Sequence, residues 1–267
     1  MRRSLERIGP NTIDIWQWSI AAEAAQAEAH LPLLSAADRA RASRFIHARD
    51  RHRFIVGRAG LRLVLSRYLH IPPARIGLAY NVFGKPRIAA AMIPELHFNL
   101  SHSADVAMLA VSDHYPVGLD IEEIKPLKED VATHFFSPRE CAELAALPEQ
   151  DYLAAFYRCW TRKEAFVKAH GAGLSLPLDT FDVTISATEP PRLKRLDGDV
   201  DAPSNWSLLE LMAPENFHGA VAALTIGNAV RLRYRREDVF RIKTSIAHPG
   251  RSDRQQNRNG GSRPIQA

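Results

Sequence analysis

Two long segments with helical character are the feature that most restricts how this chain can fold. Residues 50–69 place apolar side chains on related helical turns and stop before Pro72–Pro73, which cannot continue a helix. Residues 151–170 have the same character and end at Gly171, which suits the left-handed position after a helix. Short strand-like segments follow each of them. Because helices followed by strands occur twice, the chain is expected to form two similar-sized α+β subdomains.

Shorter segments complete the two subdomains. Further helices are expected over residues 21–31, from Ser35 toward His47, and from the N-cap Ser137. Alternating or apolar runs predict short strands at residues 11–18, 76–82, 96–100, 106–112, 118–124, 180–185, 206–211, 219–224 and 231–236. The subdomains are expected to cover residues 1–114 and 115–240, with a site near their join, since sites between subdomains are common.

The net charge of +5 belongs to the end of the chain. Residues 241–267 hold six lysines and arginines against one acid, so residues 1–240 are close to neutral. This tail is rich in Gly, Ser and Arg and poor in core-forming side chains, which predicts a disordered basic appendage. Without a basic excess, the folded part is not expected to bind nucleic acid.

Composition also limits the compartment. No apolar run approaches the roughly 20 residues that a membrane span needs, so no membrane partner is expected. The basic N-terminus leads into no apolar segment, which argues against a secretory signal. Cys141 and Cys159 form no metal-binding pattern and are expected to be the reduced thiols of a cytoplasmic protein.

The segment Gly118-Leu119-Asp120-Ile121-Glu122 places two carboxylates on one expected strand. Side chains alternate along a strand, so Asp120 and Glu122 share a face while Leu119 and Ile121 enter the core. Neighbouring carboxylates repel each other unless a cation or hydrogen-bond donors lie between them, and oxygen ligands favour Mg²⁺. Solvent exposure on an edge strand is the alternative for this motif taken alone.

Two further motifs combine polar groups that suit phosphate chemistry. Residues 160–168, Trp-Thr-Arg-Lys-Glu-Ala-Phe-Val-Lys, place Glu164 and Lys168 one turn apart on a helix face. Alone, this pair would be an ordinary surface ion pair. Ser101 and His102 follow an apolar strand and are suited to present donors to a phosphate, although a structural turn histidine is the alternative.

Basic residues gather in two places earlier in the chain. Residues 83–87, Phe-Gly-Lys-Pro-Arg, form a turn that projects Lys85, either toward a phosphate or as part of a basic surface loop. Six arginines crowd two expected helices and their connection, and one or two of them are expected to reach an anion. They are Arg41, Arg44, Arg49, Arg51, Arg53 and Arg58.

In their order and joint occurrence, these motifs resemble those of the 4′-phosphopantetheinyl transferases of the large, surfactin-synthetase-activator (Sfp) type. The matching stretches are FGKP at 83–86, FNLSHS at 98–103, GLDIE at 118–122, WTRKEAFVK at 160–168 and GLSLPLD at 173–179. The resemblance covers roughly residues 10–235. It implies a pseudo-dimer of two α+β subdomains with the active site in the cleft between them.

The resemblance also implies a reaction. Enzymes of this family move the 4′-phosphopantetheine arm of coenzyme A onto a serine of an apo acyl, peptidyl or aryl carrier protein. They release 3′,5′-ADP and need Mg²⁺, with Mn²⁺ as an alternative. By motif position, Asp120, Glu122 and Glu164 would bind the metal ion. Glu164 is also the candidate general base, directly or through a water, and Lys168 would stabilise charge on the leaving ADP.

Motif positions further imply which residues hold coenzyme A, chiefly its 3′-phosphate and adenine end. The candidates are Arg41, Arg53, Lys85, Pro86, Ser101, His102 and Lys168. One position departs from the family pattern. Close relatives carry a further lysine where this chain has Asp38, and Arg39 is the candidate substitute.

The carrier protein is expected to dock on residues 125–150, including Phe135, Phe136 and Leu144. Because one chain supplies both halves of the cleft, a monomer is expected. Two other interpretations stay open: a catalytically inactive protein that binds coenzyme A or a carrier, and another Mg²⁺-dependent phosphotransferase or nuclease. All the expected catalytic side chains are present and no Walker A or kinase signature occurs, which favours the transferase.

Overall fold

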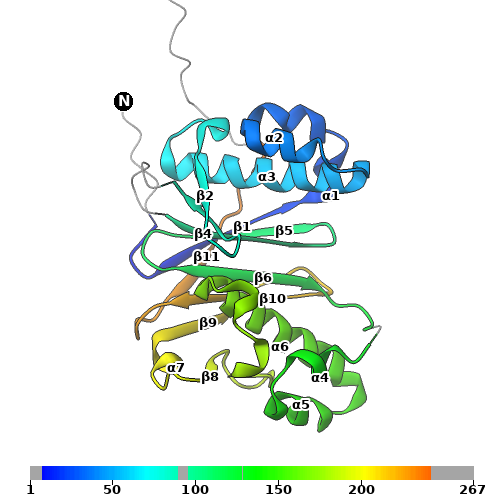
Figure 1. The fold of residues 1–267 in the computed structure, drawn as a ribbon, viewed down its shortest axis with the longest axis vertical. Helices are drawn as coiled ribbons and strands as arrows, with labels where there is room; N and C mark the ends of the chain where they lie inside the picture. The colour runs from blue at the N-terminus through cyan, green and yellow to red at the C-terminus, as the bar shows by residue number, and fades with distance from the viewer. Residues whose placement is uncertain (1–7, 90–95, 128, 242–267) are drawn as a thin grey trace, which may run out of the picture.

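The structure is a computed structural model that describes residues 8–89, 96–127 and 129–241. Its elements form four layers, with helices on the outside and two sheets packed face to face between them (Figure 1). The predicted α+β fold of two similar subdomains is confirmed. Of the predicted basic tail, residues 242–267 lie outside the described residues.

The first half packs helices on a four-stranded sheet. Its helical segments are α1 (Ile20–Ala24), the 3₁₀ segment η1 (Ala27–Leu33), α2 (Ala36–Ala42), α3 (Ala48–Leu69) and the 3₁₀ segment η2 (Pro73–Arg75). Its sheet contains, in spatial order, β11 (Arg231–Tyr234), β1 (Thr12–Ser19), β5 (Val106–Ser112) and β4 (His97–Ser103). A two-stranded hairpin of β2 (Leu78–Tyr80) and β3 (Pro86–Ile88) follows α3. Apolar side chains of α3 are buried against Trp16 and Leu109 of the sheet.

The second half packs one long helix on a three-stranded sheet. The sheet has the order β6 (Val117–Glu123), β10 (Phe217–Leu224) and β9 (Trp206–Glu210), and α6 (Glu149–His170) covers it. Phe166 of α6 is buried with Ala220 and Ala222 of β10. The surrounding elements are α4 (Val131–Phe135), α5 (Pro138–Ala145), η3 (Gly173–Ser175), η4 (Leu178–Thr180), β7 (Phe181–Val183), β8 (Leu193–Leu196) and α7 (Ala202–Asn205).

A third apolar cluster joins the two sheets. Ile13 and Ile15 of β1 meet Leu119 and Ile121 of β6 in this layer, and all four are fully buried. The predicted alternation along β6 is thereby confirmed for its apolar residues. Its other face is left for the polar side chains of the site.

The last strand does not pair with a strand of the second sheet, although residues 115–240 were expected to form one subdomain. β11 instead runs parallel to β1 at the edge of the first sheet. The reason lies in Asp14, which is fully buried on β1 and accepts hydrogen bonds from Arg233 Nε at 2.6 Å and Arg235 Nη1 at 3.3 Å. A buried carboxylate is costly unless cations pair with it, and β11 together with the residue that follows it brings two.

Most other expected elements are present, with shifted ends. The helix expected over residues 21–31 is divided, because α1 ends at Ala24 and the 3₁₀ segment η1 contains Pro32. Ser137 caps α5 through a reciprocal pair of bonds with Glu140, as predicted. The short strands β3 and β8 were not predicted. No helix within the described ranges is long and apolar enough to cross a membrane.

A glycine determines how closely α6 approaches β6. A Cβ atom added at Gly118 would lie 2.1 Å from the carbonyl oxygen of Ala165 and 2.2 Å from the amide nitrogen of Ala169. These distances are far below van der Waals contact, so only glycine lets the helix backbone lie on the strand. The contact places Glu164 and Lys168 of α6 beside Asp120 of β6.

Gly118→Ala is therefore expected to force α6 away from β6. We expect the free energy of unfolding to fall by about 3 kcal/mol, the upper end of the usual cost of overpacking, because a backbone clash cannot be relieved by a side-chain rotation. Urea denaturation followed by circular dichroism measures the change.

Gly57→Ala is the matched control, because nothing lies within 4 Å of a Cβ at that position of α3. Alanine is the better helix former, so this variant should gain about 0.5–1 kcal/mol. Similar stability for the two variants would contradict the close approach at Gly118.

Candidate active site

Polar side chains of β4 connect the two sheets. Ser101 Oγ donates to Asp120 Oδ1 at 3.0 Å and Ser103 Oγ donates to Glu122 Oε2 at 2.7 Å. Asn99 Oδ1 accepts from the amide of Leu119 at 2.8 Å. Alternate residues of β4 thus reach β6 one after another, because the side chains of a strand alternate between its faces. This polar seam holds both carboxylates of β6 in place.

An acidic cavity of about 400 Å³ opens at the seam. It brings together the three predicted metal ligands and both predicted catalytic residues. Its lining consists of Leu100, Ser101, His102, Asp120, Glu122, Trp160, Glu164 and Lys168. The helical repeat explains the choice from α6, since Trp160, Glu164 and Lys168 are successive residues at a spacing of four.

Lys163 belongs to the same motif but faces the core. It is fully buried, and its Nζ lies 2.7 Å from Glu140 Oε2 and donates to the carbonyl of Phe181 at 2.6 Å. Breaking such a buried pair leaves an uncompensated charge, which is strongly destabilising. The two lysines of the motif therefore lie on different faces of α6: Lys163 stabilises the core, and Lys168 lines the acidic cavity.

Two carboxylates of the acidic cavity, those of Glu122 and Glu164, are held in an environment that disfavours their charge. Burial raises the pKa of Glu164; the charge of Lys168 opposes this rise, and repulsion from Asp120 and Glu122 adds to it. Burial also raises the pKa of Glu122, while the bond from Ser103 opposes the rise. A group of buried acids with raised pKa values is typical of a functional site that binds a cation.

One ammonium group already lies among these acids. Lys168 Nζ is 2.5 Å from Asp120 Oδ1 and donates to Ser101 Oγ at 3.3 Å. As arranged, no three acidic, histidine or cysteine side chains within the described ranges are grouped so as to hold a metal ion. The other oxygen of Asp120, Oδ2, is buried without a hydrogen-bond partner among the described residues. An unpartnered carboxylate oxygen beside two further carboxylates fits a hard divalent cation such as Mg²⁺.

A second cavity, of about 240 Å³, continues from the acidic one and has the opposite charge. The two share Leu100 and His102. Its lining consists of Arg41, Arg53, Phe54, Gly57, Arg58, Leu61, Pro86, Asn99, Leu100 and His102. Burial and the nearby charge of Arg53 lower the pKa of His102, which favours the neutral imidazole. Three of the six arginines noted in the sequence thus line one cavity.

A third cavity, of about 300 Å³, is mainly apolar and contains the predicted lysine turn. It is lined by Phe83, Gly84, Lys85, Pro86, Asn99, Glu164, Val167, Lys168, Gly171 and Gly173. Lys85 does not line the arginine cavity. Its Nζ donates to the carbonyls of Ala169 at 3.0 Å and Val117 at 3.2 Å, and burial lowers the pKa of Lys85 to about 8.

Asn81, which sequence reasoning missed, fixes this turn. Its Oδ1 accepts from the amides of Phe83 and Lys85, and its Nδ2 donates to the carbonyl of Gly171 at 2.8 Å. The turn of the first half is thereby attached to the end of α6 in the second. An asparagine three residues before Gly84 in a turn was the available signal.

The expected carrier surface is only partly exposed. Phe135 is 48% exposed, whereas Phe136 and Leu144 are 4% and 1% exposed and belong to the second core. The expectation that all three lie at the surface is therefore wrong for two of them, because α4 and α5 turn those side chains onto α6. The ring of Phe135 packs edge-on against Trp160, with ring centres 5.9 Å apart. Trp160 in turn lines the acidic cavity.

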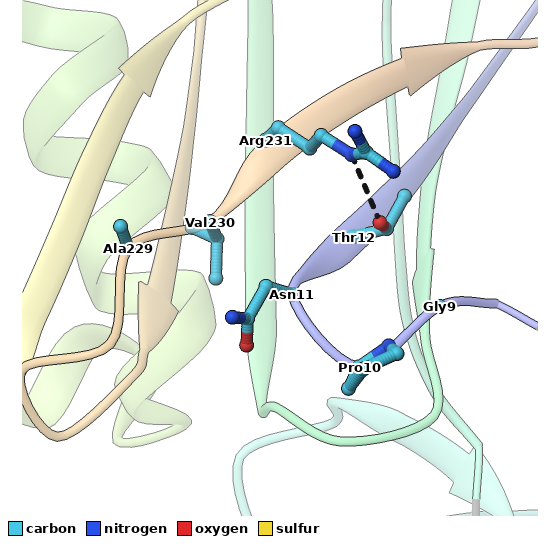
Figure 2. A pocket seen from close by; sticks show the side chains of 7 residues that line it. All are labelled: Gly9, Pro10, Asn11, Thr12, Ala229, Val230 and Arg231. Atoms are coloured by element: carbon cyan, nitrogen blue, oxygen red, sulfur yellow. Dashed lines mark hydrogen bonds between the residues drawn. The ribbon is translucent and has the colours of Figure 1, made fainter.

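Another cavity lies away from these residues, where β1 and β11 begin (Figure 2). Arg231 donates to Thr12 Oγ1 there, and the lining contains no acidic residue and no histidine. None of the predicted site residues takes part in it. The three connected cavities are therefore the better candidate.

Comparison with known proteins points to a single family. A model described as the 4′-phosphopantetheinyl transferase superfamily matches residues 116–223, and one described as the N-terminal part of 4′-phosphopantetheinyl transferase matches residues 17–114. The chain is 35% identical over 218 residues to the 4′-phosphopantetheinyl transferase HetI of Nostoc sp., covering 80% of this chain and 89% of that protein. It is 37% identical over 158 residues to the 4′-phosphopantetheinyl transferase Sfp of Bacillus subtilis, covering 59% and 69% respectively. The chain therefore belongs to the 4′-phosphopantetheinyl transferases, a family of transferase enzymes.

Proposed function

We propose that this enzyme transfers 4′-phosphopantetheine from coenzyme A to a serine of an apo carrier protein and releases 3′,5′-ADP, acting as a monomer with Mg²⁺. The observation that supports this most strongly is the acidic cavity, in which Asp120, Glu122, Glu164 and Lys168 converge. It continues into the arginine-lined cavity on one side and shares Glu164 and Lys168 with the apolar cavity on another.

The three cavities match three chemically different parts of coenzyme A. The pyrophosphate would lie in the acidic cavity, where Asp120, Glu122 and Glu164 would hold a metal ion. That ion would supply charge neutralisation and alignment of the reacting phosphate. The uncharged pantetheine arm suits the apolar cavity beside Phe83 and Val167. The nucleotide end suits the arginine-lined cavity.

Residues of α6 would move the proton and receive the charge of the reaction. Glu164 would accept the proton of the carrier serine, directly or through a water, as the serine oxygen forms its bond to the pantetheine-bearing phosphorus. The bond from that phosphorus to the ADP oxygen breaks. Lys168 would stabilise the negative charge on that oxygen, since its ammonium group already lies in the cavity. For that role it must leave Asp120 free to bind the metal ion.

Intact-mass analysis of an apo carrier protein, incubated with the enzyme, coenzyme A and Mg²⁺, tests the reaction. We expect a gain of one phosphopantetheine, and no gain when the acceptor serine is alanine or when EDTA removes the metal. Glu164→Gln and Asp120→Ala should lower the rate by about 100- to 10,000-fold, because each removes a group needed for proton transfer or metal binding.

Glu123→Gln is the matched control, since Glu123 follows Glu122 on β6 and is not among the lining residues of the acidic cavity. Its activity should stay close to that of the unchanged enzyme. No mass gain with acyl, peptidyl and aryl carriers, despite binding of coenzyme A, would favour the inactive binding protein. Hydrolysis of DNA would favour the nuclease.

We further propose that the carrier docks beside Phe135, within residues 125–150. This exposed ring contacts Trp160, which lines the acidic cavity, so a carrier bound there could present its serine to Glu164. Phe135→Ser should raise the KM for the carrier about tenfold while the KM for coenzyme A is unchanged, as expected for a buried aromatic contact.

Val200→Ser provides the control, because Val200 is equally apolar and 94% exposed but not part of this segment. Steady-state assays with each substrate varied in turn separate the two KM values. An increase in the KM for coenzyme A with Phe135→Ser would argue against a docking role.

A further inference from the structure

Arg58 is a cation of the arginine-lined cavity that motif comparison did not assign. It shares the lining with Arg41 and Arg53, and no carboxylate belongs to that lining. A partly enclosed cavity with three guanidinium groups and no acid strongly favours a multiply charged anion.

The positive charge of Arg58 is not fully neutralised by Asp38, its acidic neighbour. Arg58 Nε lies 3.6 Å from Asp38 Oδ1, but Asp38 is also paired with the buried Arg62, whose Nη2 is 2.5 Å and Nε 2.7 Å from Oδ2. Arg62 further donates to the carbonyls of Pro73 and Ile76 and is 2% exposed. One carboxylate thus faces two guanidinium groups, which leaves one positive charge beside the cavity.

The orientation of Arg58 is determined by contacts on several sides. Its Nη2 donates to Tyr80 Oη at 3.0 Å, while Asp38 lies beside Nε. Among the described residues, Nη1 has no hydrogen-bond partner. The ring of Phe54 contacts two arginines, with its centre 5.7 Å from Arg58 Cζ and 5.2 Å from Arg41 Cζ. A guanidinium held in this way loses little conformational freedom when it binds an anion.

Arg39 does not take part in this arrangement. Its Nη1 donates to the carbonyl of Leu34 at 2.5 Å, and it is not among the residues that line the cavity. Asp38, at the position where relatives carry a lysine, is turned inward to Arg62. The cation missing at residue 38 is therefore available from Arg58, one helix away.

We propose that Arg58 binds the phosphomonoester of coenzyme A and so determines preference for the 3′-phosphorylated donor. This inference rests on the proposed function, which places the pyrophosphate in the acidic cavity. The phosphomonoester is then the one remaining strong anion of the ligand. It carries close to two negative charges at neutral pH and needs a cationic cavity of its own.

Calorimetric titration with adenosine 3′,5′-bisphosphate and with 5′-AMP tests the inference without catalysis. Arg58→Gln should weaken binding of the bisphosphate by about 10- to 100-fold, the loss expected for a charge-assisted hydrogen bond. Affinity for 5′-AMP, which lacks the 3′-phosphate, should change by less than about twofold. Arg39→Gln removes the same charge from the neighbouring helix and should leave both affinities within about twofold.

Transfer assays add a second readout. For Arg58→Gln we expect a raised KM with coenzyme A, an unchanged kcat, and an unchanged KM with 3′-dephospho-coenzyme A. Arg58→Lys keeps a cation beside Asp38 and should recover part of the affinity for the bisphosphate, which keeps the test valid if Arg58→Gln unfolds.

The outcomes separate the two proposals. Equal weakening of both nucleotides by Arg58→Gln, or no weakening of either, would overturn the role of Arg58. Loss of bisphosphate affinity in Arg39→Gln would assign that role to Arg39 instead. If the unchanged enzyme transfers nothing but still binds the bisphosphate through Arg58, the proposed function fails and the phosphate site stands.

Discussion

The polar seam between β4 and β6 is the contact on which the arrangement of the site depends. Two sheets packed through Ile13, Ile15, Leu119 and Ile121 could slide past one another, because apolar packing has little directional preference. The hydrogen bonds that Asn99, Ser101 and Ser103 make with β6 remove that freedom, because each requires a specific partner in a specific direction. The carboxylates of the site are thus positioned by the same contacts that align the two halves.

Buried charges elsewhere in the molecule are paired within the protein. Asp14 is paired with Arg233 and Arg235, Asp38 with Arg62, and Glu140 with Lys163. Each pair connects elements that are distant in the sequence. Loss of one partner would be strongly destabilising, because it would leave the other charge buried and uncompensated. Charges without an equal number of partners occur in the candidate site. Carboxylates are in excess in the acidic cavity, and guanidinium groups are in excess in the arginine-lined cavity. A ligand that carries both a metal-bound pyrophosphate and a phosphomonoester would satisfy both excesses.

Sequence reasoning succeeded where a side chain's role follows from local periodicity. Alternation on β6 placed Asp120 and Glu122 together, and the helical repeat of α6 placed Glu164 beside Lys168. It was less successful where the partner of a side chain lies far along the chain. The sequence left open whether Lys85 faces a phosphate or a surface loop, and it gave no sign that carbonyls of β6 and α6 receive its ammonium group. Phe136 looked like a docking residue, yet α6 buries it.

The α+β class, the two halves and the grouping of carboxylates on β6 and α6 follow from the order of residues alone, because they depend on neighbours within a strand or a helical turn. Three features do not follow from the order of residues alone. They are the approach of α6 to β6 at Gly118, the pairing of β11 with β1 in the first sheet, and the orientation of Arg58. Each depends on which distant groups become neighbours when charge and apolar surface are buried together. These contacts are set only when the whole chain packs, because the free energy of burying a charged or apolar group depends on every group that surrounds it in the folded protein.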